Sequence, residues 1–248
     1  MWKIWNFRQT EPDLVGSWMQ RTPEPELMDA PEQASAYAAA DFSAADQALV
    51  ERIAELFPSG LGGRILDLGC GPGNISFRLA RAYSDAVVIG LDGAAAMLQL
   101  AERRLHQEGD LVGRLSFVER CLPSPDLPAG CSAVVSNSTL HHLHDPLMLW
   151  LAIAQAAAPG ARVYLKDLRR PPSPEAAEAL RERYLAEAPP VLQHDYLASL
   201  HAAFTAAEVT EQLQHSGLEM LQVAEVDDRY LEVWGEFCLL YTSDAADE

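Results

Sequence analysis

The chain has 248 residues, of which 49% are hydrophobic and 22% charged, a composition typical of a globular domain with a sizeable core. Its formal net charge of -18 disfavours nucleic-acid binding, because proteins that bind nucleic acid normally cluster Lys and Arg to neutralise phosphates. No apolar run approaches the roughly 20 residues that span a bilayer, and the start lacks the ~7–15-residue apolar core of a signal peptide, so we expect a soluble, cytoplasmic protein.

A helical segment is predicted first along the chain. It covers residues 31–57 (PEQASAYAAADFSAADQALVERIAELF), with Ser43 as a candidate N-cap and Asp46 three residues on. Residues 1–60 are expected to form an N-terminal helical preface that contributes to a lid over the functional site.

Short β-rich runs then alternate with helical stretches. The strand candidates are nearly continuously apolar: RILDLG (64–69), AVVIGLD (86–92), LSFVE (115–119), SAVVSN (132–137) and RVYLKDL (162–168). Helices are predicted between them, over residues 74–83, 94–107 and 146–158. Strands separated by helix-length segments favour βαβ units and a parallel sheet covered on both faces. Residues 61–170 are therefore predicted to be an α/β core that binds the ligand.

Beyond this core the chain contains an insertion and a final structured part. The insertion covers residues 171–204, begins with three prolines, and is expected to complete the lid. Residues 205–237 are predicted to hold one helix and two adjacent strands. Thr205 and Glu208 form a capping box at the start of that helix, and Gly217 follows its end, where a left-handed residue is favoured.

Two features of the sequence are predicted to carry no chemistry. The last eleven residues, CLLYTSDAADE, resemble a translation of sequencing-adapter DNA, so residues 238–248 are excluded from the functional reasoning as an artefactual tail. None of the four cysteines sits at CxxC spacing, and no Cys/His cluster has zinc-ligand spacing. No metal site is therefore predicted.

The segment ILDLGCGPGN (65–74) runs from a strand into a glycine-rich turn, where backbone N–H groups can approach a ligand. Asp67 precedes the glycines, and there it would repel a pyrophosphate by roughly 1 to 4 kcal/mol for charges ~4 Å apart. It would instead hold a ligand with an ammonium group. A Walker loop is excluded because no Gly-Lys-Ser/Thr follows.

Asp92 supplies the second half of this predicted site. It ends the next strand candidate, about twenty residues after the glycines, where an acidic side chain can accept both hydroxyls of a ribose. The predicted ligand therefore has a ribose, a positive amino group and no phosphate at the turn. S-adenosylmethionine fits all three requirements.

With these residues in place, the chain resembles the class I S-adenosylmethionine-dependent methyltransferases from about Met28 to Phe237. Five ordered motifs carry the resemblance: ILDLGCGPGN, VIGLDGAAAML, SNSTLHHLHDP, APGARVYLKDLRRP and FTAAEV…GL. The family implies a single domain with a Rossmann-like, doubly wound sheet of seven strands. These strands are mostly parallel with an antiparallel last strand, and helices cover both faces.

The resemblance also implies a set of residues that bind S-adenosylmethionine. Asp67 and the turn would lie near the methionine moiety, Asp92 on the ribose, and the other members beside the adenine or the sulfonium. Cys121 stands where many relatives carry an acid for the adenine amino group. The implied set is Asp67, Gly69, Cys70, Gly71, Asn74, Asp92, Gly93, Met97, Cys121, Leu122, Asn137 and Ser138.

Two candidates for catalysis each have a structural alternative. His142 follows the fourth strand, at the edge where α/β sheets bind ligands, and could take a proton from a methyl acceptor. The alternative is that His141, His142 and His144 pack the loop and cap the next helix. Tyr37 could close over the sulfonium methyl, as N-terminal aromatics of the family do, or it could be a core aromatic.

Arg169 and Arg170, just past the fifth strand, could pair with a carboxylate or phosphate of the acceptor, or could be solvated surface residues. The predicted function is methyl transfer to a small-molecule acceptor. A tRNA or protein methyltransferase would need a basic groove, which the composition does not indicate. A cofactor-binding protein without transfer activity is a further alternative. A dinucleotide oxidoreductase is the last one, and Asp67 disfavours it.

Overall fold

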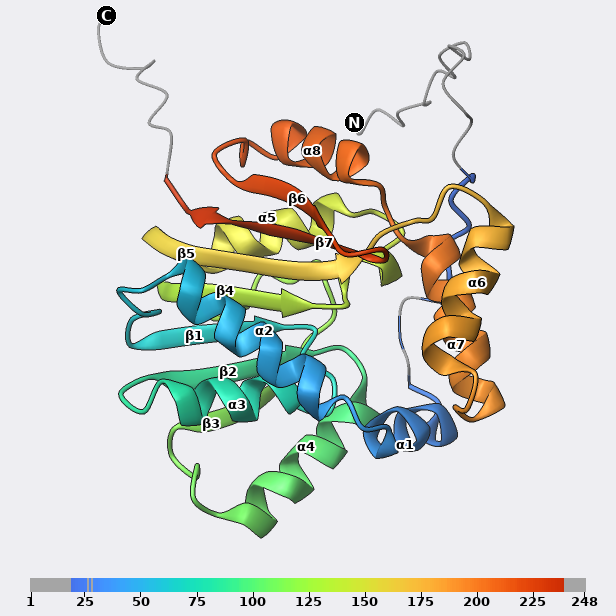
Figure 1. The fold of residues 1–248 in the computed structure, drawn as a ribbon. Helices are drawn as coiled ribbons and strands as arrows, with labels where there is room; N and C mark the ends of the chain where they lie inside the picture. The colour runs from blue at the N-terminus through green and yellow to red at the C-terminus, as the bar shows by residue number, and fades with distance from the viewer. Residues whose placement is uncertain (1–18, 26, 28, 239–248) are drawn as a thin grey trace, which may run out of the picture.

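The computed structural model describes residues 19–25, 27 and 29–238 (Figure 1). The part of the tail that resembles adapter DNA lies outside these residues from position 239 onward. Within the described ranges, no helix is both long and apolar enough to cross a membrane.

Seven strands form one sheet in the order β3-β2-β1-β4-β5-β7-β6. Neighbouring strands from β3 to β5 pair in parallel, whereas β7 pairs antiparallel with both β5 and β6. The predicted Rossmann-like sheet with an antiparallel last strand is therefore confirmed. The strands are β1 (Arg64–Leu68), β2 (Val87–Asp92), β3 (Leu115–Glu119), β4 (Cys131–Asn137), β5 (Ala157–Leu168), β6 (Gln222–Val226) and β7 (Tyr230–Glu236).

Helices cover both faces of the sheet because its strands are apolar on both sides. Ile65 and Leu66 are neighbours on β1 and point to opposite faces. Ile65 packs with α2 and α3, and Leu66 packs with α5 and α8. The helices are α1 (Pro31–Ala39), α2 (Ser43–Leu56), α3 (Asn74–Ala82), α4 (Ala95–Glu108), α5 (Leu147–Ala156), α6 (Pro174–Leu185), α7 (Pro190–Ala202), α8 (Ala206–His215) and the 3-10 turn η1 (Leu140–His142).

The helical preface differs from the prediction, because two helices, α1 and α2, replace one continuous segment. The backbone is extended at Ala40, and the Asp41 carboxylate then accepts hydrogen bonds from the Ser43 backbone N–H at 3.0 Å and from its hydroxyl at 2.5 Å. Ser43 is thus the first residue of α2 and not its N-cap, which is Phe42. The short Asp side chain favours this local turn over a continued helix.

Strand β5 also differs, since it begins at Ala157 and not at Arg162. Its first residue pairs with Cys131 of β4, and the register then shifts before Ala133. Pro159 lies in this irregular part, where a residue without a backbone N–H is tolerated.

The insertion forms a helical hairpin, α6 and α7, at the carboxyl edge of the parallel strands (Figure 1). It has a small apolar core that includes Leu168, Ala177 and Leu200. The predicted capping box of α8 is present, and Gly217 follows that helix with φ +68°. Helices α1, α6 and α7 therefore gather beside the sheet edge at which ligands bind in α/β folds.

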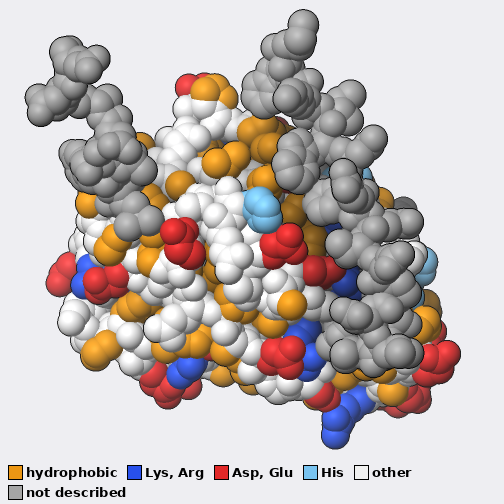
Figure 2. Space-filling view, turned by 90° about the horizontal axis from the view of Figure 1, so that it is seen from above, with side chains coloured by type: hydrophobic (Ala, Val, Ile, Leu, Met, Phe, Trp, Pro, Cys, Tyr) orange, Lys and Arg blue, Asp and Glu red, His pale blue; other side chains and the backbone are white. Residues whose placement is uncertain are grey.

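Charged side chains are dispersed over the surface. On the face seen in Figure 2, Lys and Arg are scattered among acidic side chains and do not gather into one patch. This face offers no basic groove for a polyanion.

Candidate active site

A cavity of about 840 Å³ lies at the carboxyl edge of the sheet, lined by the glycine-rich turn, the ends of β2, β4 and β5, and helices α1, α6 and α7. All residues of the implied S-adenosylmethionine set, and the catalytic candidates Tyr37 and His142, line this one cavity. These residues are Tyr37, Asp67, Gly69, Cys70, Gly71, Asn74, Asp92, Gly93, Met97, Cys121, Leu122, Asn137, Ser138 and His142.

The glycine-rich turn needs glycine for two reasons. Gly69, Gly71 and Gly73 all have left-handed φ values, between +53° and +83°, which other residues adopt only at a cost. A Cβ at Gly69 would lie 2.1 Å from Thr139 Oγ1, and one at Gly73 would lie 2.8 Å from the Phe117 ring. A Cβ at Gly71 would meet nothing within 4 Å, so open space lies beside this position.

The backbone amides of this turn are bound within the protein. The N–H groups of Gly69 and Cys70 both donate to the Leu91 carbonyl oxygen, at 2.8 and 3.0 Å. The Gly71 N–H donates to Asp92 Oδ2 at 2.8 Å. These three donors are therefore not free to bind a phosphate, which differs from the predicted approach of backbone N–H groups to a ligand. A dinucleotide pyrophosphate is disfavoured for this second reason.

Asp67 is a buried carboxylate without a basic partner. Its side chain is 1% exposed, and Oδ2 accepts a hydrogen bond from Ser76 Oγ at 2.5 Å. Burial, followed by the charge of Asp92, raises the pKa of Asp67 to about 7. Among the described residues, no Lys, Arg or His forms an ion pair with it. A positively charged ligand group in the cavity would compensate this carboxylate.

Asp92 ends β2 and links the turn to the next loop. Its Oδ1 accepts from the Ala94 N–H at 2.8 Å, while Oδ2 accepts from Gly71. Burial raises the pKa of this carboxyl, although the hydrogen bonds oppose the shift. Each carboxylate oxygen keeps a second lone pair, so Asp92 can still accept from two hydroxyl groups.

An apolar slot lies beyond Asp92. A Cβ at Gly93 would come within 2.9 Å of a Leu27 methyl carbon and 3.1 Å of Cys121 Sγ, so only glycine fits between them. Met97 is 3% exposed and packs with Ala34 of α1. The close walls suit a flat ring.

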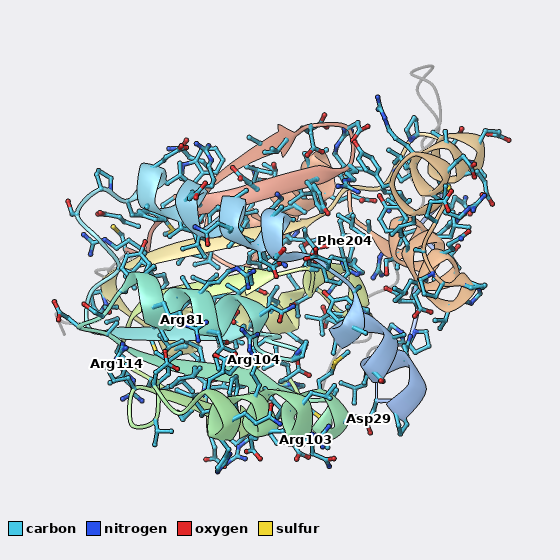
Figure 3. All side chains as sticks on the ribbon, turned by 60° about the horizontal axis from the view of Figure 1, so that its bottom comes forward. Asp29, Arg81, Arg103, Arg104, Arg114 and Phe204 are labelled. Atoms are coloured by element: carbon cyan, nitrogen blue, oxygen red, sulfur yellow. The ribbon has the colours of Figure 1, made fainter. Side chains whose placement is uncertain are left out.

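Asn74 is the first residue of α3, and its side chain is held from α4. Asn74 Oδ1 accepts from Arg104 Nη1 at 3.2 Å. The Arg104 guanidinium also lies 4.0 Å from the centre of the Phe77 ring and donates to Glu108 at 2.7 Å (Figure 3). The mouth of the glycine-rich turn is thereby fixed in place from two helices.

The end of β4 turns sharply into η1. Ser138 has φ +55°, a left-handed conformation that is uncommon for a residue other than glycine and costs about 1–3 kcal/mol. Asp167 of β5 holds the turn, because its Oδ2 accepts from the N–H groups of Thr139 and Leu140 at 2.8 and 2.7 Å. This turn presents His141 and His142 to the cavity.

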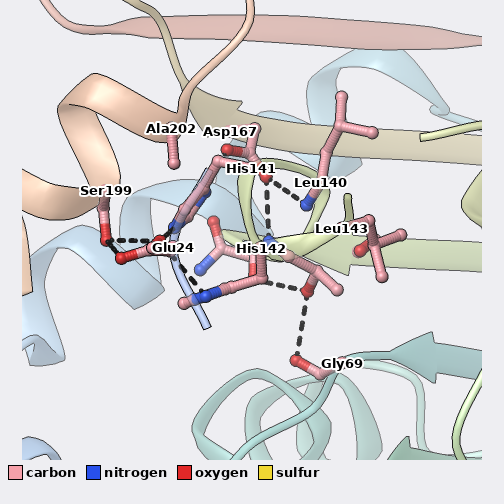
Figure 4. Close-up of polar contacts among 12 residues, drawn as sticks. Glu24, Gly69, Leu140, His141, His142, Leu143, Asp167, Ser199 and Ala202 are labelled. Carbon is pink, nitrogen blue, oxygen red and sulfur yellow. Dashed lines mark hydrogen bonds and ion pairs between the residues drawn. The ribbon is translucent and has the colours of Figure 1, made fainter. Parts of the chain in front are cut away.

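A polar cluster surrounds these histidines (Figure 4). His141 Nδ1 lies 2.5 Å from Asp167 Oδ1, and its Nε2 lies 3.5 Å from Glu24 Oε1. His142 Nδ1 lies 3.2 Å from the same Glu24 oxygen, to which Ser199 Oγ donates at 3.0 Å. The cluster connects the end of the sheet to helix α7 through Ser199.

Ionisation differs between the two histidines. Burial lowers the pKa of His141, but the charge and hydrogen bond of Asp167 together with Glu24 outweigh it, so the net shift is upward. Burial and the neighbouring His141 lower the pKa of His142 to about 3. Burial raises the pKa of Glu24. His142 is therefore neutral near pH 7, and His141 is the stronger base.

Glu24 was not found from the sequence. The resemblance began near Met28, and the only local signal is the flanking pair Pro23 and Pro25, which favours extended backbone. Residues 19–25 are held against the insertion by hydrogen bonds from the Met19 and Thr22 N–H groups to carbonyl oxygens after β5 and in α7.

Arg21 fixes the same segment. Its guanidinium donates to the carbonyl oxygens of Ala202, His141 and Leu143, at 2.5, 3.0 and 2.9 Å. It also lies 4.0 Å from the centre of the Phe204 ring. One side chain thus ties the segment that carries Glu24 to both η1 and α7.

The donor atoms of Glu24, His141 and His142 lie within 4.8 Å of one another, which is the donor set of a divalent metal site. The sequence predicted no metal, because zinc-type spacing does not reveal ligands that meet only in the fold. The same atoms also lie within ion-pair range of one another, an arrangement in which a proton can be shared without a metal.

Tyr37 is packed against its neighbours and also lies at the cavity wall. It lines the cavity, and its ring packs against the α4 cluster and lies 5.0 Å from the Phe42 ring, centre to centre. Burial raises the pKa of its hydroxyl. Within the insertion, Asp195 and Tyr196 of α7 also line the cavity, and Asp195 accepts a hydrogen bond from Gln33 of α1 at 2.9 Å.

The predicted acceptor contacts of Arg169 and Arg170 are wrong, because neither residue lines the cavity. Arg170 is 5% exposed and pairs with Glu208 at 2.6 Å, and Arg169 pairs with Glu225 at 3.3 Å. Both are structural, and Arg170 is not a solvated surface residue either. The Lys and Arg residues that line the cavity are instead Arg120, next to Cys121, and Lys166 and Arg229, which the sequence did not single out.

Sequence comparisons find the family described as "Methyltransferase domain" over residues 65–160. The chain is 36% identical over 141 residues to 27-O-demethylrifamycin SV methyltransferase of Amycolatopsis mediterranei, which covers 54% of this chain but only 49% of that relative. It is 30% identical over 194 residues to ubiquinone biosynthesis O-methyltransferase of Xanthomonas campestris pv. campestris, covering 77% of this chain and 74% of that one.

Solved structures share the fold. A SAM dependent methyltransferase from Aquifex aeolicus has a TM-score of 0.59 and 19% identity, and the match covers 84% of this chain and 98% of that one. The plantazolicin methyltransferase in complex with a triazolic analog and SAH has a TM-score of 0.60 and 13% identity, covering 84% and 90%.

Proposed function

This chain belongs to the family of S-adenosylmethionine-dependent methyltransferases, and we propose that it methylates an oxygen atom of a small-molecule acceptor. One observation carries the proposal: a buried carboxylate without a basic partner, Asp67, faces the same cavity as the His141–Asp167 pair. A cationic cofactor and a hydroxyl acceptor satisfy these two features at once.

The wall near the glycine-rich turn fits the cofactor. When bound, S-adenosylmethionine supplies a methyl group activated by a sulfonium, an ammonium group and a ribose. Asp67 would hold the ammonium group, and Asp92 would accept from the ribose hydroxyls. The slot at Gly93, Met97 and Cys121 would hold the adenine. The remaining cofactor contacts proposed are Gly69, Cys70, Gly71, Asn74, Leu122, Asn137 and Ser138.

A small acceptor is supported by the enclosed shape of the site. The cavity volume of about 840 Å³ falls within the roughly 300–1,000 Å³ of small-molecule sites. Helices α1, α6 and α7 line its outer part, and we propose that they act as the lid. The net charge of -18 opposes a nucleic-acid acceptor.

An oxygen acceptor is supported by the basic group in the cavity and by the printed names of the relatives above. An alcohol or phenol must lose its proton as its oxygen bonds to the methyl carbon, and a positioned base takes that proton. His141 has the arrangement for this task, since Asp167 behind Nδ1 orients the ring and stabilises the imidazolium.

His142, the base expected from the sequence, remains a second candidate. It is neutral near pH 7 and can accept a hydrogen bond from the acceptor, but a pKa of about 3 makes it a poor holder of a transferred proton. We propose that His142 orients the acceptor while His141 receives the proton. Tyr37 would cover the reacting methyl group from the lid side.

Calorimetric titration of the purified chain with S-adenosylmethionine and, separately, with NADH tests the proposal. We expect binding of the first only, and its loss in Asp92→Ala. Asp85→Ala, which removes an exposed acid outside the cavity, is the matched control and should bind normally. A screen of phenols and alcohols with methyl-labelled cofactor would then identify the acceptor. A folded protein that does not bind S-adenosylmethionine would overturn the proposal.

A further inference from the structure

Two basic side chains line the cavity on the side of β5 and β7, Lys166 and Arg229. Lys166 pairs in the sheet with Asn137 of β4 and Glu232 of β7. Its Nζ lies 4.4 Å from the centre of the Tyr230 ring, and the Arg229 guanidinium carbon lies 4.8 Å from the same ring centre. The shared ring places both cations in one part of the cavity.

Neither cation has an acidic partner within 4.0 Å among the described residues. Most other arginines of the chain do have one, as expected for a protein of net charge -18. The paired arginines are Arg52, Arg78, Arg81, Arg104, Arg162, Arg169, Arg170, Arg181 and Arg183. Arg120, on another part of the cavity wall, also has no such partner among the described residues, so the distinguishing feature of Lys166 and Arg229 is that both lie beside the Tyr230 ring.

The nearby carboxylates are already occupied. Glu232, beside Lys166, accepts from the Tyr164 hydroxyl at 2.8 Å and from Arg52 at 3.2 Å. Asp227 Oδ1 accepts from the backbone N–H of Arg229 at 2.9 Å. Burial lowers the pKa of Lys166, and the charges of Asp227 and Glu232 oppose this shift.

Unsatisfied hydrogen-bond donors accompany the two charges. Arg229 Nε is buried without a hydrogen-bond partner, and so is the Tyr196 hydroxyl. The Arg229 guanidinium carbon lies 3.4 Å from the centre of the Tyr184 ring, which keeps the side chain in place. Tyr184, Tyr196 and Tyr230 all line the cavity, as does Arg229, so the side chains that carry these buried donors border space that a ligand can enter. A ligand oxygen placed beside them is therefore favoured over an apolar group.

These observations favour a carboxylate over a phosphate. Asp195 also lines the cavity and opposes the charge of about -1.5 to -2 that a phosphate monoester carries. A carboxylate carries a single negative charge, so Asp195 repels it less than it repels a phosphate. The apolar side chains of Leu168, Leu185 and Leu192 border the same cavity and suit a hydrophobic body next to the carboxylate.

We propose that Lys166, Arg229 and Tyr196 form an anion subsite that binds a carboxylate of the methyl acceptor. The substrates would then be hydroxylated carboxylic acids, in which the hydroxyl reaches His141 while the carboxylate is held near β7. This inference rests on the proposed function, because it assigns one end of the acceptor of that same site.

The test measures how tightly hydroxylated acids and their neutral methyl esters bind to protein that is saturated with S-adenosylhomocysteine. The probes are 4-hydroxyphenylacetate, 4-hydroxycinnamate and 10-hydroxydecanoate, each beside its methyl ester, with 4-hydroxybenzylphosphonate as the more highly charged anion. Calorimetry is expected to give at least tenfold tighter binding of one or more acids than of the matched ester. The phosphonate should bind more weakly than the acids.

Variants assign this preference to the named residues. Lys166→Gln and Arg229→Gln should each lower the affinity for the acid by tenfold or more and leave the ester unaffected. Arg103→Gln, which removes an exposed positive charge on α4 (Figure 3), is the matched control and should keep the preference. Thermal unfolding and S-adenosylhomocysteine binding show whether each variant is folded.

The outcomes separate the two proposals. Failure of S-adenosylhomocysteine to bind contradicts the proposed function itself. If it binds while acids and esters bind equally, or while no acid of the panel binds, the anion subsite is wrong and the methyltransferase proposal stands. Tighter binding of the phosphonate than of every acid would also overturn the assignment to a carboxylate.

Discussion

Asp167 holds His141 and the turn that carries it with a single carboxylate. One oxygen lies 2.5 Å from His141 Nδ1, and the other accepts the N–H groups of Thr139 and Leu140. The orientation of the ring and the course of the backbone at the end of β4 therefore depend on the same group. This relationship holds the His141 ring in one orientation at the cavity wall, as the proposed base requires.

His141→Gln is expected to lower kcat by about 10²–10⁴-fold for the acceptor, while the Kd for S-adenosylmethionine stays unchanged. His142→Gln should mainly raise KM. In the wild-type protein, kcat/KM should increase with pH as the imidazolium, whose pKa lies above its ordinary value, loses its proton. The His141 variant should lose this limb of the profile. If His142→Gln lowers kcat more than His141→Gln does, His142 is the base.

The affinity for S-adenosylmethionine is expected to increase as the pH rises through about 7. Asp67 has a pKa raised to about 7 in the free protein, and only its ionised form attracts an ammonium group. Calorimetry between pH 6 and pH 7.5 measures this dependence, and Asp67→Asn should bind weakly at every pH. An affinity that does not change over this range in the wild-type protein would argue against the contact.

The raised pKa of Asp67 also makes the stability of the folded protein depend on pH. The folded-state pKa of Asp67 lies above that of the unfolded chain, so its contribution favours the folded state most below pH 3.8 and is lost as pH rises towards about 7. Asp67→Asn should therefore stabilise the protein relative to wild type near pH 8. Urea unfolding at pH 5 and pH 8 compares the two proteins.

Gly69→Ala is expected to reduce the free energy of unfolding by roughly 2–5 kcal/mol. Its Cβ would be strained by the left-handed φ and would collide with Thr139. Gly60→Ala is the matched control, because Gly60 also has a positive φ but open space around it, and it should cost only about 1–2 kcal/mol. Equal losses in urea unfolding would show that the contact with Thr139 is not tight.

Removal of metal ions by EDTA is expected to leave kcat unchanged. The donor atoms of Glu24, His141 and His142 already contact one another, and Asp167 orients His141. Elemental analysis before and after dialysis provides the control for removal. Loss of activity that returns on adding Zn²⁺ would instead assign these three residues to a metal.

The fold, and the residues that line the cavity around the glycine-rich turn, could be predicted because their signals are local. Alternating strands and helices, the glycine-rich turn and the acids Asp67 and Asp92 all lie within short stretches of chain. In contrast, Glu24 reaches the site only because Arg21 holds its segment against η1 and α7. No periodicity or spacing in the sequence indicates such a contact.

The basic residues show the same division between local and long-range information. Arg169 and Arg170 follow β5 directly, which suggested acceptor contacts, but the fold provides each with an acidic partner from the C-terminal part of the chain. Lys166 and Arg229 looked unremarkable because their lack of a partner is a property of the folded neighbourhood. The break between α1 and α2 was missed because one Asp side chain outweighed a continuous helical pattern.

Deletion of the residues up to Pro25 would leave every residue of the sheet and of the glycine-rich turn in the chain. It would remove the segment that Arg21 clamps to three carbonyl groups, and the Glu24 carboxylate with it. We expect such a shortened protein to bind S-adenosylmethionine while it lacks one member of the cluster around His141. The position at which an expressed chain begins is therefore a choice with chemical effects.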